Sequence, residues 1–155
     1  SKEFIMTKFK FTLFLMVGML ALVGCSKSKQ ELLVGHWECN GQEEGMRFSG
    51  TMEYVSNGKS NAMMEMSGNE SGVPILFELM AQGTWEINDT ELLESIQKLT
   101  VTRFSVGGKE LPPENFPQEM KDALIGVSSG SEIIQLDERV LLVKNAGTQT
   151  TCLRQ

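Results

Sequence analysis

The regular alternation of apolar and polar residues restricts the fold of this chain more than any other feature. Residues 46–54 read MRFSGTMEY, in which apolar or small side chains at even positions alternate with polar or charged ones. A period of two is typical of a β-strand with one buried and one solvated face. Asn57 and Gly58 follow, and both residues tolerate the positive φ angles of a tight hairpin turn. The pattern therefore predicts two antiparallel strands joined at this turn.

Similar alternation extends along most of the chain and predicts a mainly β protein. Residues 90–99 are compatible with either a strand or a helix, because Leu92, Ile96 and Leu99 have helical spacing. One short amphipathic helix is predicted at residues 116–126. Further strands are predicted at residues 33–39, 62–66, 73–81, 85–87, 100–106, 132–136, 139–144 and 148–154.

The order of these elements indicates how the sheet closes. Eight or nine strands follow one another, mostly in hairpins, and the sequence shows neither βαβ alternation nor an internal repeat. A long antiparallel sheet tends to curl and close on itself, because closure removes its exposed edges. The sequence therefore predicts an antiparallel up-and-down β-barrel with one short helix, in which the first and last strands meet.

The start of the chain carries a short apolar segment after basic residues. Residues 11–24 are FTLFLMVGMLALVG, and Lys8 and Lys10 precede them. A membrane-spanning helix needs about 20 apolar residues, so this segment is too short to cross a bilayer. The pattern is typical of a secretory signal peptide that begins at Met6, with residues 1–5 as additional upstream sequence.

The end of this segment resembles the lipobox of bacterial lipoproteins, because residues 22–25, LVGC, place a small residue directly before a cysteine. The resemblance implies cleavage before Cys25, a diacylglyceryl group on its sulfur and acylation of the new amino terminus. The alternative is an ordinary signal peptide with a coincidental cysteine. Ser26 follows, where an aspartate would favour the inner membrane, and so an outer-membrane location is expected. The implied divisions are a signal peptide (1–24), a lipidated polar tether (25–32) and a barrel domain (33–155).

The assignment of Cys25 to lipid leaves two cysteines to explain. Cys39 and Cys152 are then an even pair in an exported domain, which predicts a disulfide. They lie near the two ends of the mature chain, so the bond would join the first and last strands of the barrel. A redox or metal pair is the less favoured alternative, because C-x-x-C spacing is absent and His36 is the only histidine.

Two short motifs are similar to sequences of lipocalins and lipocalin-like bacterial lipoproteins. Gly35-His36-Trp37 matches their Gly-x-Trp on the first strand, and residues 83–87, GTWEI, match a Gly-x-Trp strand in mid-chain. The resemblance implies a lipocalin-like barrel in which Trp37 packs across the closed end. The chain differs from true lipocalins because its predicted helix precedes the last strands.

The net charge argues against one large class of partners. The chain carries a formal net charge of −6, and cleavage before Cys25 would remove three lysines and one glutamate, which leaves −8. Nucleic-acid binding needs clustered lysine and arginine residues, and so it is not expected for this protein. The membrane is expected as a partner through the lipid anchor alone.

Methionine is unusually frequent, with ten residues in the chain, and several lie on predicted inward faces. Flexible thioether side chains can fill an ordinary core or adapt to ligands of different shapes, and both interpretations are open. Copper(I) binding is a weaker interpretation, because Met63 would point away from Met64 and Met66 on a strand. The residues predicted to line a pocket for an apolar ligand are Trp37, Met52, Met64, Met66, Phe77 and Trp85.

No catalytic, metal or cofactor site is predicted. His36 lies without a paired serine or cysteine, so a nucleophilic triad cannot be assembled. The carboxylates are scattered along the chain and form no recognisable acid–base pair. The sequence therefore predicts a non-enzymatic, lipid-anchored envelope protein that binds a small apolar ligand in its barrel. The alternative is an accessory subunit of an envelope protein assembly that docks through residues 112–126.

Overall fold

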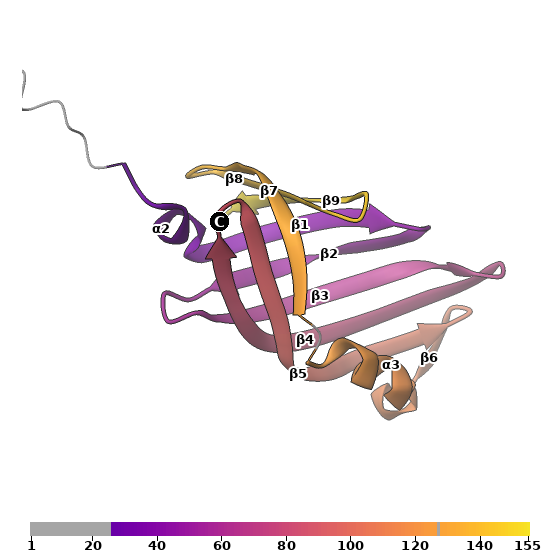
Figure 1. Ribbon diagram of the computed structural model, residues 1–155. Helices are drawn as coiled ribbons and strands as arrows, with labels where there is room; N and C mark the ends of the chain where they lie inside the picture. Colours follow the sequence, from indigo (N-terminus) through magenta and orange to yellow (C-terminus); the bar gives the residue numbers. More distant parts are fainter. Residues whose placement is uncertain (1–25, 127) are drawn as a thin grey trace, which may run out of the picture.

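The computed structural model describes residues 26–126 and 128–155, and most of them form strands of one curved sheet (Figure 1). The predicted signal peptide and Cys25 lie outside the described residues. The helices are α2 (Lys29–Leu33), the 3-10 helix η2 (Pro113–Asn115) and α3 (Gln118–Leu124). The strands are β1 (Gly35–Glu43), β2 (Met46–Tyr54), β3 (Lys59–Glu70), β4 (Val73–Asn88), β5 (Glu91–Val106), β6 (Lys109–Leu111), β7 (Ser128–Leu136), β8 (Val140–Asn145) and β9 (Thr148–Arg154).

The strands close into a barrel. Along the sheet the order is β4-β3-β2-β1-β9-β8-β7-β5, and the pairing of β4 with β5 joins the two ends of this row. Eight strands of the described chain thus form a closed ring, while β6 pairs only with the end of β5. All pairings between these strands are antiparallel. The predicted up-and-down β-barrel is therefore confirmed.

The predicted hairpin turn at Asn57 and Gly58 joins β2 to β3. Gly58 has a φ of 82°, which residues other than glycine rarely adopt. The Asn57 side-chain oxygen accepts a 3.0 Å hydrogen bond from the backbone N–H of Lys59. The register that follows places Tyr54 opposite Ser60. The turn thereby fixes which side chains of both strands face the barrel interior.

Residues 90–99, whose sequence is compatible with helix or strand, are part of strand β5. Two register shifts interrupt the pairing of β5 with β4, and they leave Gln97 and Thr102 without a partner across the ladder. An extra residue of this kind reverses which face the following side chains occupy. Leu92 and Leu99 are therefore both buried, although strict alternation would place them on opposite faces. The bulge at Gln97 explains the apparent helical spacing.

The predicted helix at residues 116–126 is present as α3, which is shorter at both ends. Pro117 occupies the position before the helix, and Gly126 follows its end with a φ of 78°. Phe116 lies outside the helix and is buried against Phe77 and Phe104, with ring centroids 5.1 and 5.4 Å away. This side chain fixes the insertion of β6, η2 and α3 between β5 and β7 to the barrel (Figure 1).

The segment predicted as a polar tether contains helix α2, and the first strand begins at Gly35 rather than at Leu33. Ser28 caps the helix, because its hydroxyl oxygen accepts a 3.2 Å hydrogen bond from the Glu31 backbone N–H. Leu33 is fully buried and packs in one cluster with Trp37. Helix α2 therefore covers one end of the barrel, which we call the closed end (Figure 1).

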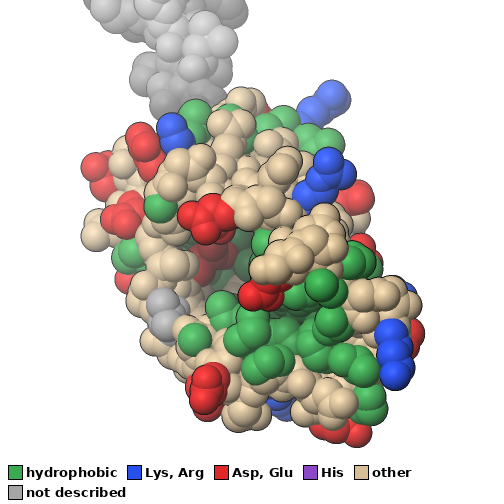
Figure 2. Space-filling model, turned by 90° about the vertical axis from the view of Figure 1, so that its right-hand side faces the viewer, with side chains coloured by type: hydrophobic (Ala, Val, Ile, Leu, Met, Phe, Trp, Pro, Cys, Tyr) green, Lys and Arg blue, Asp and Glu red, His purple; other side chains and the backbone are tan. Residues whose placement is uncertain are grey.

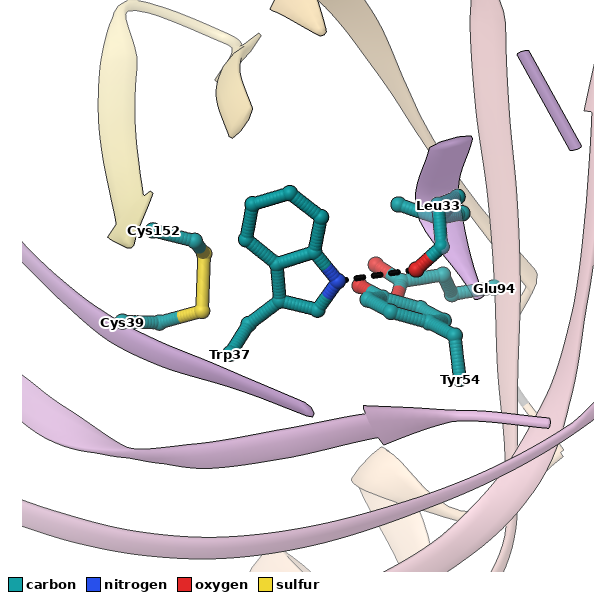
Figure 3. The surroundings of a disulfide bond; sticks show 6 residues. All are labelled: Leu33, Trp37, Cys39, Tyr54, Glu94 and Cys152. Carbon is teal, nitrogen blue, oxygen red and sulfur yellow. Dashed lines mark hydrogen bonds between the residues drawn. A yellow bond between two sulfur atoms is a disulfide. The ribbon is translucent and has the colours of Figure 1, made fainter. Parts of the chain in front are cut away.

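The closed end is held by a disulfide and a buried tryptophan. Cys39 on β1 and Cys152 on β9 lie directly opposite each other, with Cα atoms 4.0 Å apart, and form the predicted disulfide. The Trp37 indole N–H donates a 2.8 Å hydrogen bond to the Leu33 carbonyl (Figure 3). Trp37 thus packs across the closed end, as the motif implies. The closed-end cluster consists of Leu33, Trp37, Cys39, Tyr54, Trp85, Leu92, Leu141, Val143 and Cys152.

Arg154 at the end of β9 connects helix α2 to the closed end. Its guanidinium carbon lies 4.3 Å from the centroid of the Trp37 ring. The same group donates hydrogen bonds to the carbonyls of Leu32, Val34 and Glu138. The first two carbonyls belong to the end of α2, where backbone acceptors lack partners within the helix. One side chain therefore joins the helix, the first strand and the turn before β8.

A second group of buried residues fills the barrel farther along the long strands β4 and β5, away from α2. It includes the aromatic contacts of Phe116 with Phe77 and Phe104. Partly buried methionines from β2 and β3 pack against it. We call this group the distal cluster, and its members are Phe77, Leu79, Ala81, Leu99, Val101, Phe104 and Phe116.

Candidate functional site

A cavity of 460 Å³ lies inside the barrel between the closed-end cluster and the distal cluster. Strands β2, β3, β4 and β5 supply most of its wall, and Ala123 and Leu124 of α3 also line it. Figure 2 shows the end of the molecule away from α2, where hydrophobic side chains gather around a hollow and acidic side chains lie beside it. The larger apolar lining residues are Phe48, Met52, Met64, Met66, Leu79, Ile96, Leu99 and Leu124.

Three of the methionines that are predicted to line a pocket do line this cavity. Met52 comes from β2, and Met64 and Met66 come from β3. The neighbouring Met63 lies on the opposite face of β3, with 59% of its surface exposed. Met46 packs against the distal cluster and is not part of the cavity wall. The alternation read from the sequence therefore places these side chains correctly, and their contact with a ligand stays a prediction.

The three aromatic residues predicted to line the same pocket lie in the two packed clusters instead. Trp37 fills the closed end, and the Trp85 indole N–H donates a 3.0 Å hydrogen bond to the Val55 carbonyl. Phe77 packs against Phe116 in the distal cluster. None of the three belongs to the cavity lining of the described chain, because neighbouring side chains cover their rings. These residues belong to the packed core, and Leu79, Ala81 and Leu99 are the members of the distal cluster that line the cavity.

The wall contains the carboxylate of Glu94, which lies in the first part of β5. The register places Glu94 opposite Trp85 on β4. The Tyr54 hydroxyl donates a 2.7 Å hydrogen bond to Glu94 Oε1 (Figure 3). Tyr54 itself belongs to the closed-end cluster, and its ring meets the Trp85 ring edge-on at 5.8 Å. Glu94 therefore lies where the closed end and the cavity meet.

Burial shifts the titration of both hydrogen-bonded groups. It raises the pKa of the Glu94 carboxyl above its ordinary value, and the hydrogen bond from Tyr54 offsets part of that shift. The pKa of the Tyr54 hydroxyl is raised well above its ordinary value by burial first, and then by the charge and hydrogen bond of Glu94. An ionised carboxylate at such a position is costly unless a donor or a cation compensates it.

Glu94 is not among the site residues predicted from the sequence, although the sequence contains a signal for it. If residues 90–99 are taken as a strand, then Leu92, Glu94 and Ile96 share one face. A glutamate between two apolar residues on an inward face is unusual, because glutamate is almost never fully buried unless it is paired. The ambiguity between helix and strand concealed this exception to the alternation.

The charged groups around the cavity have one sign. Glu43 at the end of β1 and Glu94 both line it, and its described lining contains no lysine, arginine or histidine. Within residues 26–126 and 128–155, no group of three or more His, Cys, Asp or Glu residues is placed to hold a metal ion. Among the helices in those same ranges, none has the length and apolar character needed to span a bilayer.

Comparisons with known proteins place the chain in no established family. No protein-family model matches it, and no curated protein matches it. One similar solved structure is a lipocalin-like protein from Bacteroides uniformis, with a TM-score of 0.44 and 11% sequence identity. The match covers 80% of this chain and 99% of that chain. The assignment of a closed barrel therefore rests on the strand pairing of this chain itself.

Proposed function

We propose that this protein is a non-enzymatic binding protein that holds a small apolar ligand inside its barrel. The observation that carries the proposal is the 460 Å³ cavity, whose wall is mainly apolar and which lies between two packed clusters. Ligand sites are typically concave, mostly apolar and about 300–1,000 Å³ in volume. A cavity of this size inside an otherwise packed barrel fits that description.

The composition of the wall supports a ligand that is bound by shape and apolar contact. Each square ångström of apolar surface removed from water contributes roughly 25 cal/mol, so an aliphatic or aromatic body would supply most of the affinity. Met52, Met64 and Met66 have flexible side chains that can repack around ligands of different shapes. We therefore expect tolerance for several related apolar molecules rather than one rigid structure.

We also propose that a lipid anchor on Cys25 holds the barrel on the outer membrane. The support is the lipobox resemblance of residues 22–25, together with Ser26 after the cysteine. Two or more acyl chains on one residue would give stable attachment, because one chain alone binds only reversibly. Membrane fractionation and mass spectrometry of the mature amino terminus test this proposal. Recovery of an unmodified Cys25 from the membrane fraction would contradict it.

A displacement experiment tests the binding function. The fluorescence of the apolar probe N-phenylnaphthylamine should increase with saturable, one-to-one binding to the purified protein in detergent-free buffer. Met64→Trp should reduce this binding by filling the cavity, whereas Met63→Trp places the same ring on the outer face and should leave binding unchanged. Thermal unfolding of both variants shows whether they are folded. The absence of saturable binding by the wild-type protein would overturn the proposal.

A second candidate function is docking to a protein of the cell envelope through the insertion. The specific observation is that Met120, Leu124 and Ile125 are 49%, 38% and 37% exposed on and beside α3. Exposed apolar side chains that lie close together are typical of interaction surfaces. Crosslinking in intact cells should then yield a stoichiometric complex that Met120→Glu removes and Met63→Glu does not. Recovery of the wild-type protein without any stoichiometric partner would exclude this candidate.

A further inference from the structure

The charge of the cavity restricts the kind of ligand beyond its apolar body. Glu94 and Glu43 line the cavity, and no cationic side chain belongs to its described lining. An anionic ligand such as a fatty acid would therefore meet charges of its own sign and find no partner for its head group. A neutral ligand would leave the carboxylates uncompensated, whereas a cationic group would pair with them.

Glu94 also has a carboxylate oxygen without a hydrogen-bond partner among the described residues. Its Oε1 accepts the hydrogen bond from the Tyr54 hydroxyl, while Oε2 receives no hydrogen bond from any described residue. No fully buried side-chain oxygen or nitrogen of the described chain lacks a partner. Oε2 is therefore not enclosed by protein atoms, and Glu94 belongs to the cavity wall. This oxygen can accept a further hydrogen bond, and the residue that carries it lines the cavity.

We infer that the preferred ligand carries a cationic amine on an apolar body, with its ammonium group donating a hydrogen bond to Glu94 Oε2. This inference rests on the proposed function, because it names the ligand class of the same cavity. Hydrogen bonds between ionised partners are roughly twice as strong as neutral ones, and the effect increases where water is excluded. Tyr54 holds the carboxylate in place from the other side. The apolar body would lie along the methionines of β2 and β3.

Three probes of equal chain length separate head-group charge from apolar contact. At neutral pH, decylamine is cationic, decanol is neutral and decanoate is anionic. Each is titrated against the complex of the wild-type protein with N-phenylnaphthylamine. We expect decylamine to displace the probe at about ten- to a hundredfold lower concentration than decanol, given the strength of a hydrogen bond to a charged group. Decanoate should be the weakest competitor.

Two matched variants locate the charge that recognises the amine. Glu94→Gln keeps the shape of the side chain and an acceptor for Tyr54 but removes the charge. The advantage of decylamine over decanol should therefore fall to about threefold or less, which corresponds to about 0.6 kcal/mol. Glu43→Gln removes the exposed carboxylate at the end of β1 and should leave most of the preference intact. The affinity for decanol should fall in neither variant, because decanol carries no positive charge for a carboxylate to pair with. Lowering the pH until Glu94 is protonated should reproduce the effect of Glu94→Gln.

The outcomes separate this inference from the function on which it rests. If decanol binds and decylamine binds no better, the amine preference is wrong while apolar binding stands. If none of the three probes competes, the proposed binding function itself fails. A preference that survives in Glu94→Gln would also overturn the inference, since another group would then recognise the amine. The comparison of probes on the wild-type protein remains decisive even if a variant does not fold.

Discussion

The two halves of this barrel share one sheet but differ in how side chains fill their interiors. At the closed end, Trp37 is fully buried and the disulfide joins β1 to β9. Arg154 lies over the Trp37 ring and donates hydrogen bonds to the end of α2. In the other half, mainly β2, β3, β4 and β5 surround a 460 Å³ cavity. The inward face carries methionines there, whereas it carries tryptophans at the closed end. Backbone pairing continues through both halves. The difference lies in side-chain volume, so packing rather than strand pairing separates the filled end from the part that contains the cavity.

The largest expected effect comes from removing the centre of the closed end. Trp37→Ala should lower the free energy of unfolding by about 3–5 kcal/mol, because it deletes a fully buried ring and the hydrogen bond to Leu33. Met64→Ala, on the cavity wall, should cost less than half as much, because this side chain already borders empty space. Urea denaturation of both variants measures the difference. Equal losses of unfolding free energy would show that both halves contribute equally to stability, and would contradict the difference described above.

The disulfide should have the next largest effect. Replacing both Cys39 and Cys152 by alanine should lower the free energy of unfolding by about 2–4 kcal/mol, since the bond restricts an unfolded loop with a sequence separation of 113. Denaturation of the wild-type protein with and without reductant gives an independent measure. Probe binding below the unfolding transition should be unchanged, because neither cysteine lines the cavity. Lost binding in the folded variant would instead link the closed end to the ligand site.

Tyr54→Phe tests the contact between the two halves. The variant keeps the ring in the closed-end cluster but leaves the Glu94 carboxylate without its donor. Because that hydrogen bond lowers the pKa of Glu94, its loss should raise the pKa further. The free energy of unfolding at neutral pH should fall by about 1–3 kcal/mol, and by less in acid, where Glu94 is protonated. A loss that is independent of pH would show that the contact with Glu94 is not its cause.

The smallest expected effect is the pH dependence contributed by Glu94. Its pKa is raised in the folded protein from an ordinary value of 4.5, so the folded state binds the proton more tightly than the unfolded state. The stability from this group is complete below the ordinary pKa and is lost as the pH rises through the folded pKa. Glu94→Gln should lack this decline, and its stability relative to the wild-type protein should increase from acid to neutral pH. Parallel stability profiles, measured by denaturation across that range, would contradict the assignment.

The sequence predicts the framework of the barrel better than its interior. Alternation and the Asn57-Gly58 turn depend on neighbouring residues, so the strands and the first hairpins can be read locally. The Cys39–Cys152 disulfide could be predicted as well, because only two cysteines remain after the lipobox assignment. Strand β5 is harder to predict from the sequence, because the bulge at Gln97 interrupts the alternation of apolar and polar residues.

The candidate site could be predicted only in part, because a cavity depends on residues that are distant in sequence. The inward positions of Met52, Met64 and Met66 follow from alternation alone. Whether Trp85 lines a pocket or fills a core depends on its contact with Tyr54 on another strand. The role of Glu94 likewise depends on the Tyr54 hydroxyl, 40 residues away along the chain. No local pattern contains these contacts.

The insertion between β5 and β7 can change in sequence without changing the barrel ring. Its helix α3 supplies Ala123 and Leu124 to the cavity wall, yet the barrel ring closes through β4, β5 and β7 without it. The insertion therefore adds two side chains to a cavity wall that the barrel strands otherwise supply. Changes in the length or composition of this one continuous segment can therefore alter part of the cavity wall, while the strand register of the barrel remains the same.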